Sequence, residues 1–166
     1  MTVSVCVPRD SAATSVGANA VAKAIVAEPT QRNLGIKLVR NGSRGLLWLE
    51  PLVEVATAEG RVGYGPVTVA DVAALFDSDF LTGADNFFSV GLVDEILWLA
   101  DQQRVTFSRV GVIDPLDISD YEAHGGVVGL RAAIELDQSA IVDEYLRPAY
   151  AVAVEPGAPP PSNGAL

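Results

Sequence analysis

The spacing of apolar and polar residues predicts alternating strands and helices over the first 77 residues. Residues 2–7 alternate and are rich in β-branched side chains, which predicts a first strand. From Thr14 onward apolar residues recur at helical spacing, and Thr14 or the serine after it can cap the start. Pro29 lacks an amide donor, so it should end this helix or push its end outward. A second strand is predicted over residues 35–40.

A turn, a hairpin and another helix follow. Glycines and polar residues fill the turn at 41–45, and strands are predicted at 52–57 and 61–65. The Ala-Glu-Gly between these strands is a hairpin signal, since glycine adopts positive φ easily. Thr68 and Asp71 have the spacing of a capping box before the next helix. This order predicts an α/β domain over residues 1–77.

After this domain, apolar residues recur with a less regular spacing. Residues 78–103 are predicted to be a connector that starts polar, with scattered aromatic side chains. Within it, residues 92–99 carry apolar side chains at helical spacing. Residues 104–112 are predicted to form a short strand, which begins a last, mostly helical segment over residues 104–147.

Three short helices are predicted in that segment. Asp117 or Ser119 can cap the first, which should stop at the paired glycines after His124, and the second covers residues 127–136. Ser139 is the expected cap of the third, and Pro148 should end it. Residues 148–166 are rich in Pro, Gly and Ala, so we expect a disordered tail there.

Composition narrows the class of protein. Hydrophobic residues make up 49% of the 166 residues, which predicts a packed core. Every apolar run is shorter than the roughly 18 residues of a membrane helix, and no secretory signal opens the chain, so a cytoplasmic location is expected. A net charge of −10 disfavours nucleic-acid binding. The acidity favours either plain solubility or a docking face for a basic partner.

Few residues are candidates for chemistry. The single cysteine, Cys6, excludes an internal disulfide and a multi-cysteine metal site, and its place in a strand predicts a small buried hydrophobe. His124 lies at a predicted helix end, where capping is favoured over catalysis. Trp48 and Trp98 are expected to be core or interface anchors. Arg9-Asp10-Ser11 is predicted to be a polar turn, with a partner contact as the alternative.

Two further clusters have structural and functional interpretations. Asp114, Asp117, Asp120 and Glu122 resemble a calcium loop in composition, but they lack the glycine and the terminal glutamate of an EF-hand, so helix capping is favoured. The turn Gly42–Gly45 could present backbone amides and Arg44 to an anion, although a plain turn is favoured.

One sequence resemblance involves the loops of the first domain. Thioredoxin-like [2Fe–2S] ferredoxins bind their cluster through C-x4-C-x3-G-A and C-x-G-x-C-x3-P-x-V-x-V. Gly17-Ala18 and the run from Gly45 to Val55 match the outline of these motifs. The four ligand positions hold other residues, namely Pro8, Ala13, Ser43 and Leu47. Iron in such clusters is held by thiolates, so the resemblance implies the scaffold without its cluster.

A second resemblance lies further along the chain. The run RVGVIDPLDISDYEAHGGVVGLRAAI resembles the N-terminal segment of the NADH-oxidising flavoprotein subunit of respiratory complex I, with Val127 in place of an aromatic residue. A cluster-less thioredoxin-like domain ahead of that segment is similar to the beta subunit of soluble, molybdenum-dependent, NAD-dependent formate dehydrogenases. The match covers Val3 to Glu144.

This resemblance implies a parent enzyme that oxidises formate and passes electrons through iron–sulfur clusters and FMN to NAD+. Its partners would be the molybdenum alpha subunit and the [2Fe–2S] gamma subunit. After Glu144 the family's glycine-rich FMN and NADH loop is missing, and so is the later [4Fe–4S] motif. We therefore assign no catalytic, cofactor-binding or metal-binding residue, and no cofactor, to this chain.

The expected function is a structural docking portion of such a beta subunit. The alternatives are a free-standing, cluster-less thioredoxin-like adaptor for a redox partner, and a non-functional gene fragment. Because the family pattern is lost so abruptly after Glu144, a truncated or frameshifted reading is a further hypothesis. Sequencing of the locus tests it, since an intact frame with no glycine-rich loop in any nearby frame would contradict it.

Overall fold

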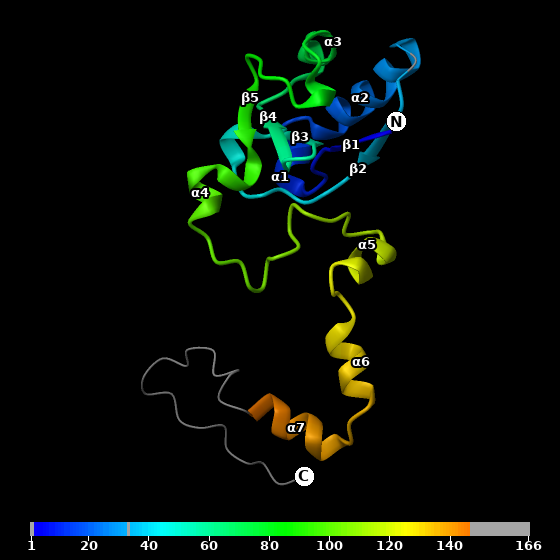
Figure 1. Ribbon diagram of the computed structural model, residues 1–166, viewed down its shortest axis with the longest axis vertical. Helices are drawn as coiled ribbons and strands as arrows, with labels where there is room; N and C mark the ends of the chain where they lie inside the picture. The colour runs from blue at the N-terminus through cyan, green and yellow to red at the C-terminus, as the bar shows by residue number, and fades with distance from the viewer. Residues whose placement is uncertain (1, 33, 147–166) are drawn as a thin grey trace. The chain divides into compact units, whose positions relative to one another are not determined.

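Five short strands rich in valine pair into one sheet in the computed structural model, which describes residues 2–32 and 34–146 (Figure 1). The order across the sheet is β2-β1-β3-β4-β5. β1 and β2 are parallel, and the other neighbours are antiparallel. The strand bounds are Val3–Cys6 for β1, Ile36–Val39 for β2, Val53–Ala56 for β3, Arg61–Tyr64 for β4 and Ser89–Leu92 for β5.

The predicted hairpin between β3 and β4 is confirmed. Thr57 donates its amide N–H to the carbonyl of Gly60 at 2.8 Å, and Gly60 has φ of 140°. Glycine suits this position because a side chain disfavours such a φ. The turn fixes the register, so Val55 lies opposite Val62 and both side chains belong to the core.

Three helices pack against one face of the sheet: α1 (Ser11–Ser15), α2 (Ala18–Arg32) and α3 (Val72–Asp77). The expected helix start at Thr14 was wrong, because Asp10 caps α1 and Gly17, with φ of 101°, separates α1 from α2. The capping box of Thr68 and Asp71 is confirmed, with a 3-10 turn between it and α3.

Pro29 does not end α2, so the first of the two expected outcomes at this proline was wrong. The helix continues to Arg32, and the Pro29 carbonyl accepts a hydrogen bond from Leu34 N–H at 3.0 Å. Pro29 lies near the C-terminal end of the helix, so its missing donor removes one intrahelical bond and leaves the rest intact. An ion pair between Arg32 and Glu28 at 3.0 Å adds local support.

The apolar core lies between the sheet and these helices. Val5, Val55, Tyr64, Leu75 and Phe80 are fully buried there. The Tyr64 and Phe80 rings meet edge to face, with centroids 5.7 Å apart. The Tyr64 hydroxyl donates to the Ala84 carbonyl at 2.8 Å, which satisfies its polar end, and burial raises its pKa to about 12. Burial of this apolar surface is the main stabilising term for the sheet.

The sheet extends beyond the expected domain boundary at residue 77. β5 pairs with β4, so that Leu92 lies opposite Val62. The helical spacing over 92–99 corresponds to an α-helix only in its last part, since Leu92 ends β5. A 3-10 turn (Val93–Glu95) and the short helix α4 (Leu97–Ala100) follow. Pairing with a preformed edge strand overrides the local helical period here.

Residues 104–112 form successive turns, so the predicted strand there was also wrong. The expected start of α5 (Ile118–Ala123) is confirmed, because the Asp117 side chain accepts from the amides of Ser119 and Asp120. The expected stop is confirmed as well, since His124 is the C-cap and Gly125 has φ of 74°.

The chain divides into two compact units, one up to His124 and one from Gly125 onward. The second unit contains α6 (Val128–Ile134) and α7 (Gln138–Leu146). The cap of α7 is Asp137, whose carboxylate accepts from Ala140 N–H at 2.9 Å, and Ser139 is not the cap. Asp is among the strongest cap residues, and it comes one turn before the amide that it binds. The predictions for Pro148 and the tail lie outside the described residues.

Candidate functional site

The structure brings together the two segments that carry the vacant cluster positions. Arg9 donates its amide N–H to the Asn41 carbonyl at 3.0 Å. The Arg40 guanidinium donates to the carbonyls of Val7 and Pro8, each at 3.0 Å. These bonds hold the residues after β1 beside the residues after β2, and this location is our candidate site.

The four ligand positions offer no thiolate. Pro8 and Ala13 are buried, while Leu47 is exposed at the start of a 3-10 turn (Leu47–Leu49). Ser43 is the one position with a side-chain ligand atom, and its hydroxyl accepts a hydrogen bond from Gly45 N–H at 3.0 Å. Within the described residues, no group of three His, Cys, Asp or Glu side chains could hold a metal ion.

The Asp10 carboxylate joins the two segments. Its Oδ1 accepts from Ala13 N–H at 3.0 Å and caps α1, and its Oδ2 accepts from the backbone N–H of Ser43. Both amides belong to residues at vacant cluster positions. Asp10 therefore connects by hydrogen bonds the two loops that a cluster would connect through iron.

Glu50 is a second acidic side chain near this junction and is only 6% exposed. Its Oε2 accepts from Leu52 N–H at 3.0 Å. Burial raises the pKa of Glu50 above its ordinary value, and nearby Asp10 and Glu54 add to the rise, while hydrogen bonds from Ser43 and Leu52 oppose it. Burial therefore makes Glu50 easier to protonate here than in water, because it disfavours the charged carboxylate.

Arg44 turns inward, away from any anion in solvent. Its guanidinium donates from Nε to Glu54 Oε1 at 2.7 Å and from Nη2 to Glu54 Oε2 at 3.0 Å. Glu54 is fully buried and also accepts from Arg61 Nη1 at 3.2 Å. Burial alone would lower the pKa of Arg44, but the bonds to Glu54 raise it. The structure thus supports a plain turn at Gly42–Gly45 and argues against an anion site there.

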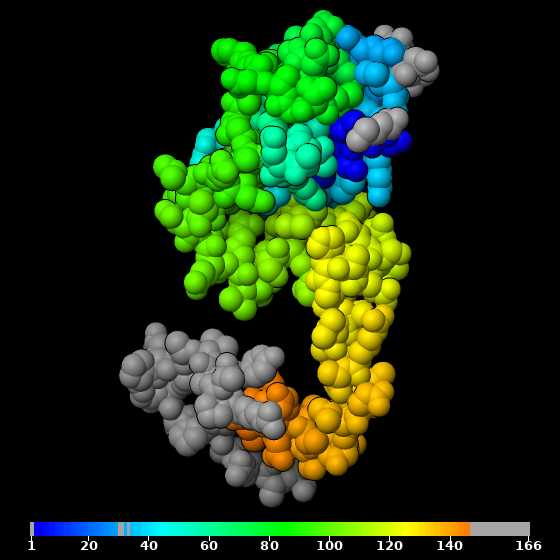
Figure 2. Space-filling model, in the orientation of Figure 1, coloured from blue at the N-terminus to red at the C-terminus, as the bar shows by residue number. Residues whose placement is uncertain are grey.

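These arginines also hold residues 104–113, which we call the strap, on the face of the sheet opposite the helices. Arg61 donates to the carbonyls of Gly111 at 3.0 Å and Val112 at 2.6 Å. The Asn41 side chain also donates to Gly111 O, at 2.8 Å, and Arg104 donates to Arg44 O, at 2.9 Å. In the space-filling view the yellow-green strap lies directly against the sheet domain (Figure 2).

Sequence reasoning missed this network, although one signal was available. Glu54 alternates with Val53 and Val55 inside a strand, so its side chain must point to the face opposite the apolar core. A charged residue at such a position needs a partner of opposite charge. The partners could not be identified from the sequence, because Arg44 and Arg61 come close to Glu54 only when the chain is folded.

Cys6 is buried as predicted. It is 1% exposed, and burial raises the pKa of its thiol to about 11, so the thiol is protonated and unreactive near neutral pH. It lines a cleft of about 420 Å³ together with Lys37, Arg61 and Asp120. Because the lining carries both signs of charge, the cleft selects no single class of ligand.

The acidic cluster and His124 have structural roles, as predicted. Asp117 caps α5, and Asp120 Oδ2 accepts from Asp114 N–H at 2.8 Å. His124 Nδ1 lies 3.2 Å from Asp120 Oδ1 and 2.8 Å from the Asp120 carbonyl. The carboxylates therefore organise one turn of chain and do not converge on a cation.

The two tryptophans are surface residues, which excludes the core alternative. Trp48 is 60% exposed and Trp98 is 61% exposed, and their rings meet edge to face with centroids 6.1 Å apart. They come from the 3-10 turn after the Gly-rich loop and from α4. Exposed paired tryptophans are typical of interaction surfaces.

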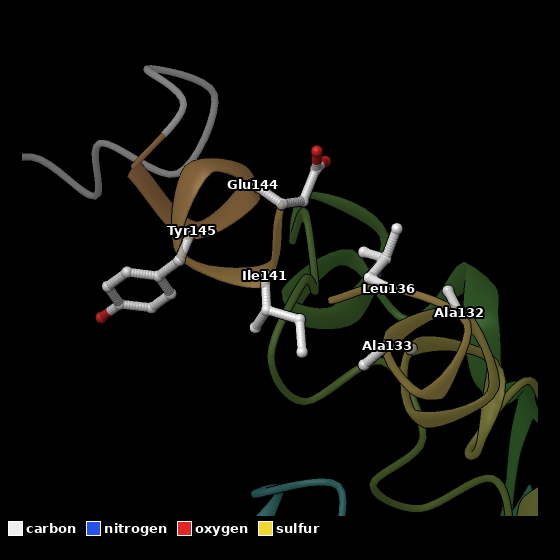
Figure 3. A pocket seen from close by; sticks show the side chains of 7 residues that line it. Ala132, Ala133, Leu136, Ile141, Glu144 and Tyr145 are labelled. Atoms are coloured by element: carbon white, nitrogen blue, oxygen red, sulfur yellow. The ribbon is translucent and has the colours of Figure 1, made fainter. Parts of the chain in front are cut away.

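A separate hollow of about 440 Å³ lies between α6 and α7 in the second unit. Figure 3 shows its lining side chains, with Ala132 and Ala133 on α6, Leu136 after it and Ile141 on α7. The lining is mainly apolar, and no residue of either helix is buried. This hollow has the character of a contact surface, and Glu144 and Tyr145 of α7 supply its polar groups.

Comparisons with known proteins find matches among solved structures alone. No known protein family matches the sequence, and no curated protein matches it. Among solved structures, the chain is similar to a thioredoxin-like [2Fe–2S] ferredoxin from Aquifex aeolicus, at 19% identity over 54% of this chain and 97% of that one, with a TM-score of 0.45. A cysteine-to-serine variant of that ferredoxin matches with a TM-score of 0.43, again at 19% identity, over 54% of this chain and 98% of that one.

The topology itself defines the fold class, as predicted. A parallel β-α-β unit, an antiparallel hairpin and a helix on the shared face form an α/β, thioredoxin-like ferredoxin fold. This chain has one cysteine where such ferredoxins need four ligands. Among the described residues, no helix is both long enough and apolar enough to cross a membrane.

Proposed function

We propose that this chain is a docking module that positions redox subunits and carries no electrons itself. The observation that supports it best is the Asp10 junction, in which a carboxylate joins the loops at the vacant cluster positions. A loop pair stabilised this way keeps its shape without iron. The scaffold is then available for contacts while its redox chemistry is absent.

The assembly that we propose is a soluble, molybdenum-dependent, NAD-dependent formate dehydrogenase. Support comes from the sequence resemblance of residues 109–134 to the complex I flavoprotein segment and of residues 41–55 to the formate dehydrogenase beta subunit. In that assembly the parent beta subunit would use FMN, a [4Fe–4S] cluster and NAD, none of which we assign to this chain. The exposed apolar side chains of α6 and α7 fit a segment that packs on a larger body.

A pull-down of the tagged chain with the purified molybdenum alpha subunit and [2Fe–2S] gamma subunit tests this function. We expect at least one subunit to be retained, with no iron or flavin on the chain when it is eluted alone. Failure to retain either subunit at low and at physiological salt would contradict the formate dehydrogenase role. Iron or flavin bound to the isolated chain would contradict the docking role.

A free-standing adaptor is the second candidate. The observation that favours it is that the sheet, its helices and the strap form one unit up to His124, with a complete apolar core. An adaptor would be monomeric and stable alone and would bind a redox partner other than the formate dehydrogenase subunits. The same pull-down separates the two candidates.

A further inference from the structure

The exposed tryptophans and the leucines next to them define what we call the Trp surface: Leu47, Trp48, Leu97 and Trp98. Leu47 is 61% exposed and Leu97 is 80% exposed, so all four large apolar side chains face solvent. They come from two segments about fifty residues apart in sequence, and the contact between the two indoles joins these segments. Apolar side chains grouped in this way commonly mark a binding surface.

A small buried cluster supports the Trp surface from below. Leu46, Val93 and Leu99 form this cluster, which is separate from the main core, and Leu49 and Ile96 pack against it. In each segment these residues flank the exposed Leu-Trp pair, so the chain buries one side of each turn and presents the other. A supported aromatic pair loses little conformational entropy on binding, which favours affinity.

Exposed acidic residues flank the helix that carries half of the Trp surface. Asp94 and Glu95 precede α4, Asp101 follows it, and all three are exposed. Arg44 of the Gly-rich loop pairs with buried Glu54 and, at 3.3 Å, with Asp94, so the charge of Asp94 is partly balanced. Arg104 lines a small cleft together with Asp94 and Leu99, so Glu95 and Asp101 are the acidic residues on which the choice of partner rests.

This charge decides which kind of partner fits. A second copy of the chain would bring the same acidic residues against each other across a symmetric interface, which is repulsive. A basic partner face would gain attraction from those residues. An arginine or lysine could also lie over the face of an indole in a cation–π contact, which tryptophan supports best among the aromatic residues.

We propose that the Trp surface docks a basic face of a partner subunit, with a cationic side chain against the indoles and apolar side chains against the leucines. This inference rests on the proposed docking function and names the surface and the chemistry of its partner. Because Trp48 and Trp98 are the only tryptophans in the chain, a tryptophan label reports on this surface alone.

The test uses the full chain labelled with 5-fluorotryptophan and followed by 19F NMR. The purified, unlabelled alpha and gamma subunits described above are the probes, added at about 50 mM and at about 300 mM NaCl, where screening differs strongly. We expect both 19F resonances to shift and to lose their H2O/D2O solvent-isotope effect on binding. We also expect weaker binding at the higher salt concentration.

Two variants and two matched controls sharpen the test. Removing both indoles (Trp48→Ala with Trp98→Ala) should weaken binding by about thirtyfold or more. Phe87→Ala, which removes another exposed aromatic side chain at 94% exposure, should leave binding unchanged.

The second variant tests the acidic residues. Glu95→Gln with Asp101→Asn should weaken binding by about threefold to tenfold at low salt only, while the control Glu59→Gln with Asp85→Asn should not. Thermal unfolding confirms that each variant is folded.

The outcomes separate this inference from the proposed function. A complex in which the 19F resonances and the indole variant behave like the controls would overturn the Trp surface and leave the docking function standing. Failure to form any complex with either subunit would overturn both this inference and the formate dehydrogenase role. Resonances that shift with the concentration of the chain alone would overturn the basic partner in favour of a second copy.

Discussion

On one face of the sheet Val55 and Tyr64 pack against α2 and α3, whereas on the other face Glu54 is buried against Arg44 and Arg61. The apolar face gains stability from burial and tolerates many arrangements of similar side chains. The polar face must remove three charges from water, so it is stable only when each group has its partners. We infer that the apolar face supplies most of the stability and that the ion network sets where the strap lies.

The largest expected effect comes from breaking the ion network at its centre. Glu54→Ala leaves two arginine charges without their shared partner, and we expect it to cost about 3–5 kcal/mol of unfolding free energy. Urea denaturation measures this loss. The exposed Glu59→Ala should change stability by less than about 0.5 kcal/mol.

A matched change on the apolar face distinguishes the roles of the two faces. Leu75→Ala should also lower the unfolding free energy by about 2–5 kcal/mol. However, we expect faster amide hydrogen exchange in the strap, ahead of the rest of the chain, in Glu54→Ala and not in Leu75→Ala. If both variants loosen the strap equally at matched stability, the ion network does not position it.

The next effect concerns the close approach of the strap to Arg44. Gly111 has φ of 82°, and a Cβ built on it would lie 2.6 Å from Arg44 Cγ. Gly111→Ala should therefore cost about 2 kcal/mol, from backbone strain and displacement of the arginine. Gly129→Ala, in α6 with open space around the added methyl, should instead be stabilising by about 0.5–1 kcal/mol. Chemical denaturation measures the unfolding free energy of both variants. Changes of the same sign in the two variants would contradict this prediction.

A smaller loss is expected at the junction of the two loops. Asp10→Ala removes the cap of α1 and the bond to Ser43 N–H, and we expect it to cost about 1–2 kcal/mol. Asp10→Asn keeps one acceptor oxygen and should recover part of that loss. Thermal unfolding of both variants measures the difference, and equal stability of Asp10→Ala and the parent chain would refute the role of Asp10 as a link.

The smallest effect depends on pH and involves Glu50. Because burial raises the pKa of Glu50 in the folded state, the folded chain binds a proton at Glu50 more readily than the unfolded chain does. Its favourable contribution is present below the unfolded pKa and is lost as the pH rises through the raised folded pKa. Glu50→Gln should therefore raise Tm at pH 7, and the gain should shrink as the pH falls toward about 4. If the gain in Tm of Glu50→Gln grew as the pH fell, the pKa of Glu50 would be lowered and not raised in the folded state.

Local signals predicted much of the thioredoxin-like unit. The alternation in β1, the Gly60 hairpin and the Thr68–Asp71 capping box each depend on neighbouring residues, and each is confirmed. β5 was missed, because a four-residue segment becomes a strand only when the edge of β4 is there to pair with it. The strap was predicted as a strand for a related reason. Its apolar residues alternate as in a strand, but hydrogen bonds from arginine side chains to its carbonyls hold it in turns.

The candidate site was predictable in outline and not in detail. The vacant positions at Ser43 and Leu47 followed from a motif, so the absence of ligands could be stated from the sequence. The role of Asp10 could have been inferred in part, because aspartate directly before Ser-Ala-Ala is a good helix cap. Its second bond, to Ser43, joins residues far apart in the chain and depends on how the loops fold together.

The most direct test of the central claim is an iron determination combined with thermal unfolding. The chain is purified from iron-supplemented cells and measured before and after anaerobic treatment with iron and sulfide. We predict a colourless protein with background iron and the same Tm in both states, because Asp10 and not a cluster joins the loops. Stoichiometric iron with visible absorption, or a Tm that falls when iron is chelated, would contradict the account.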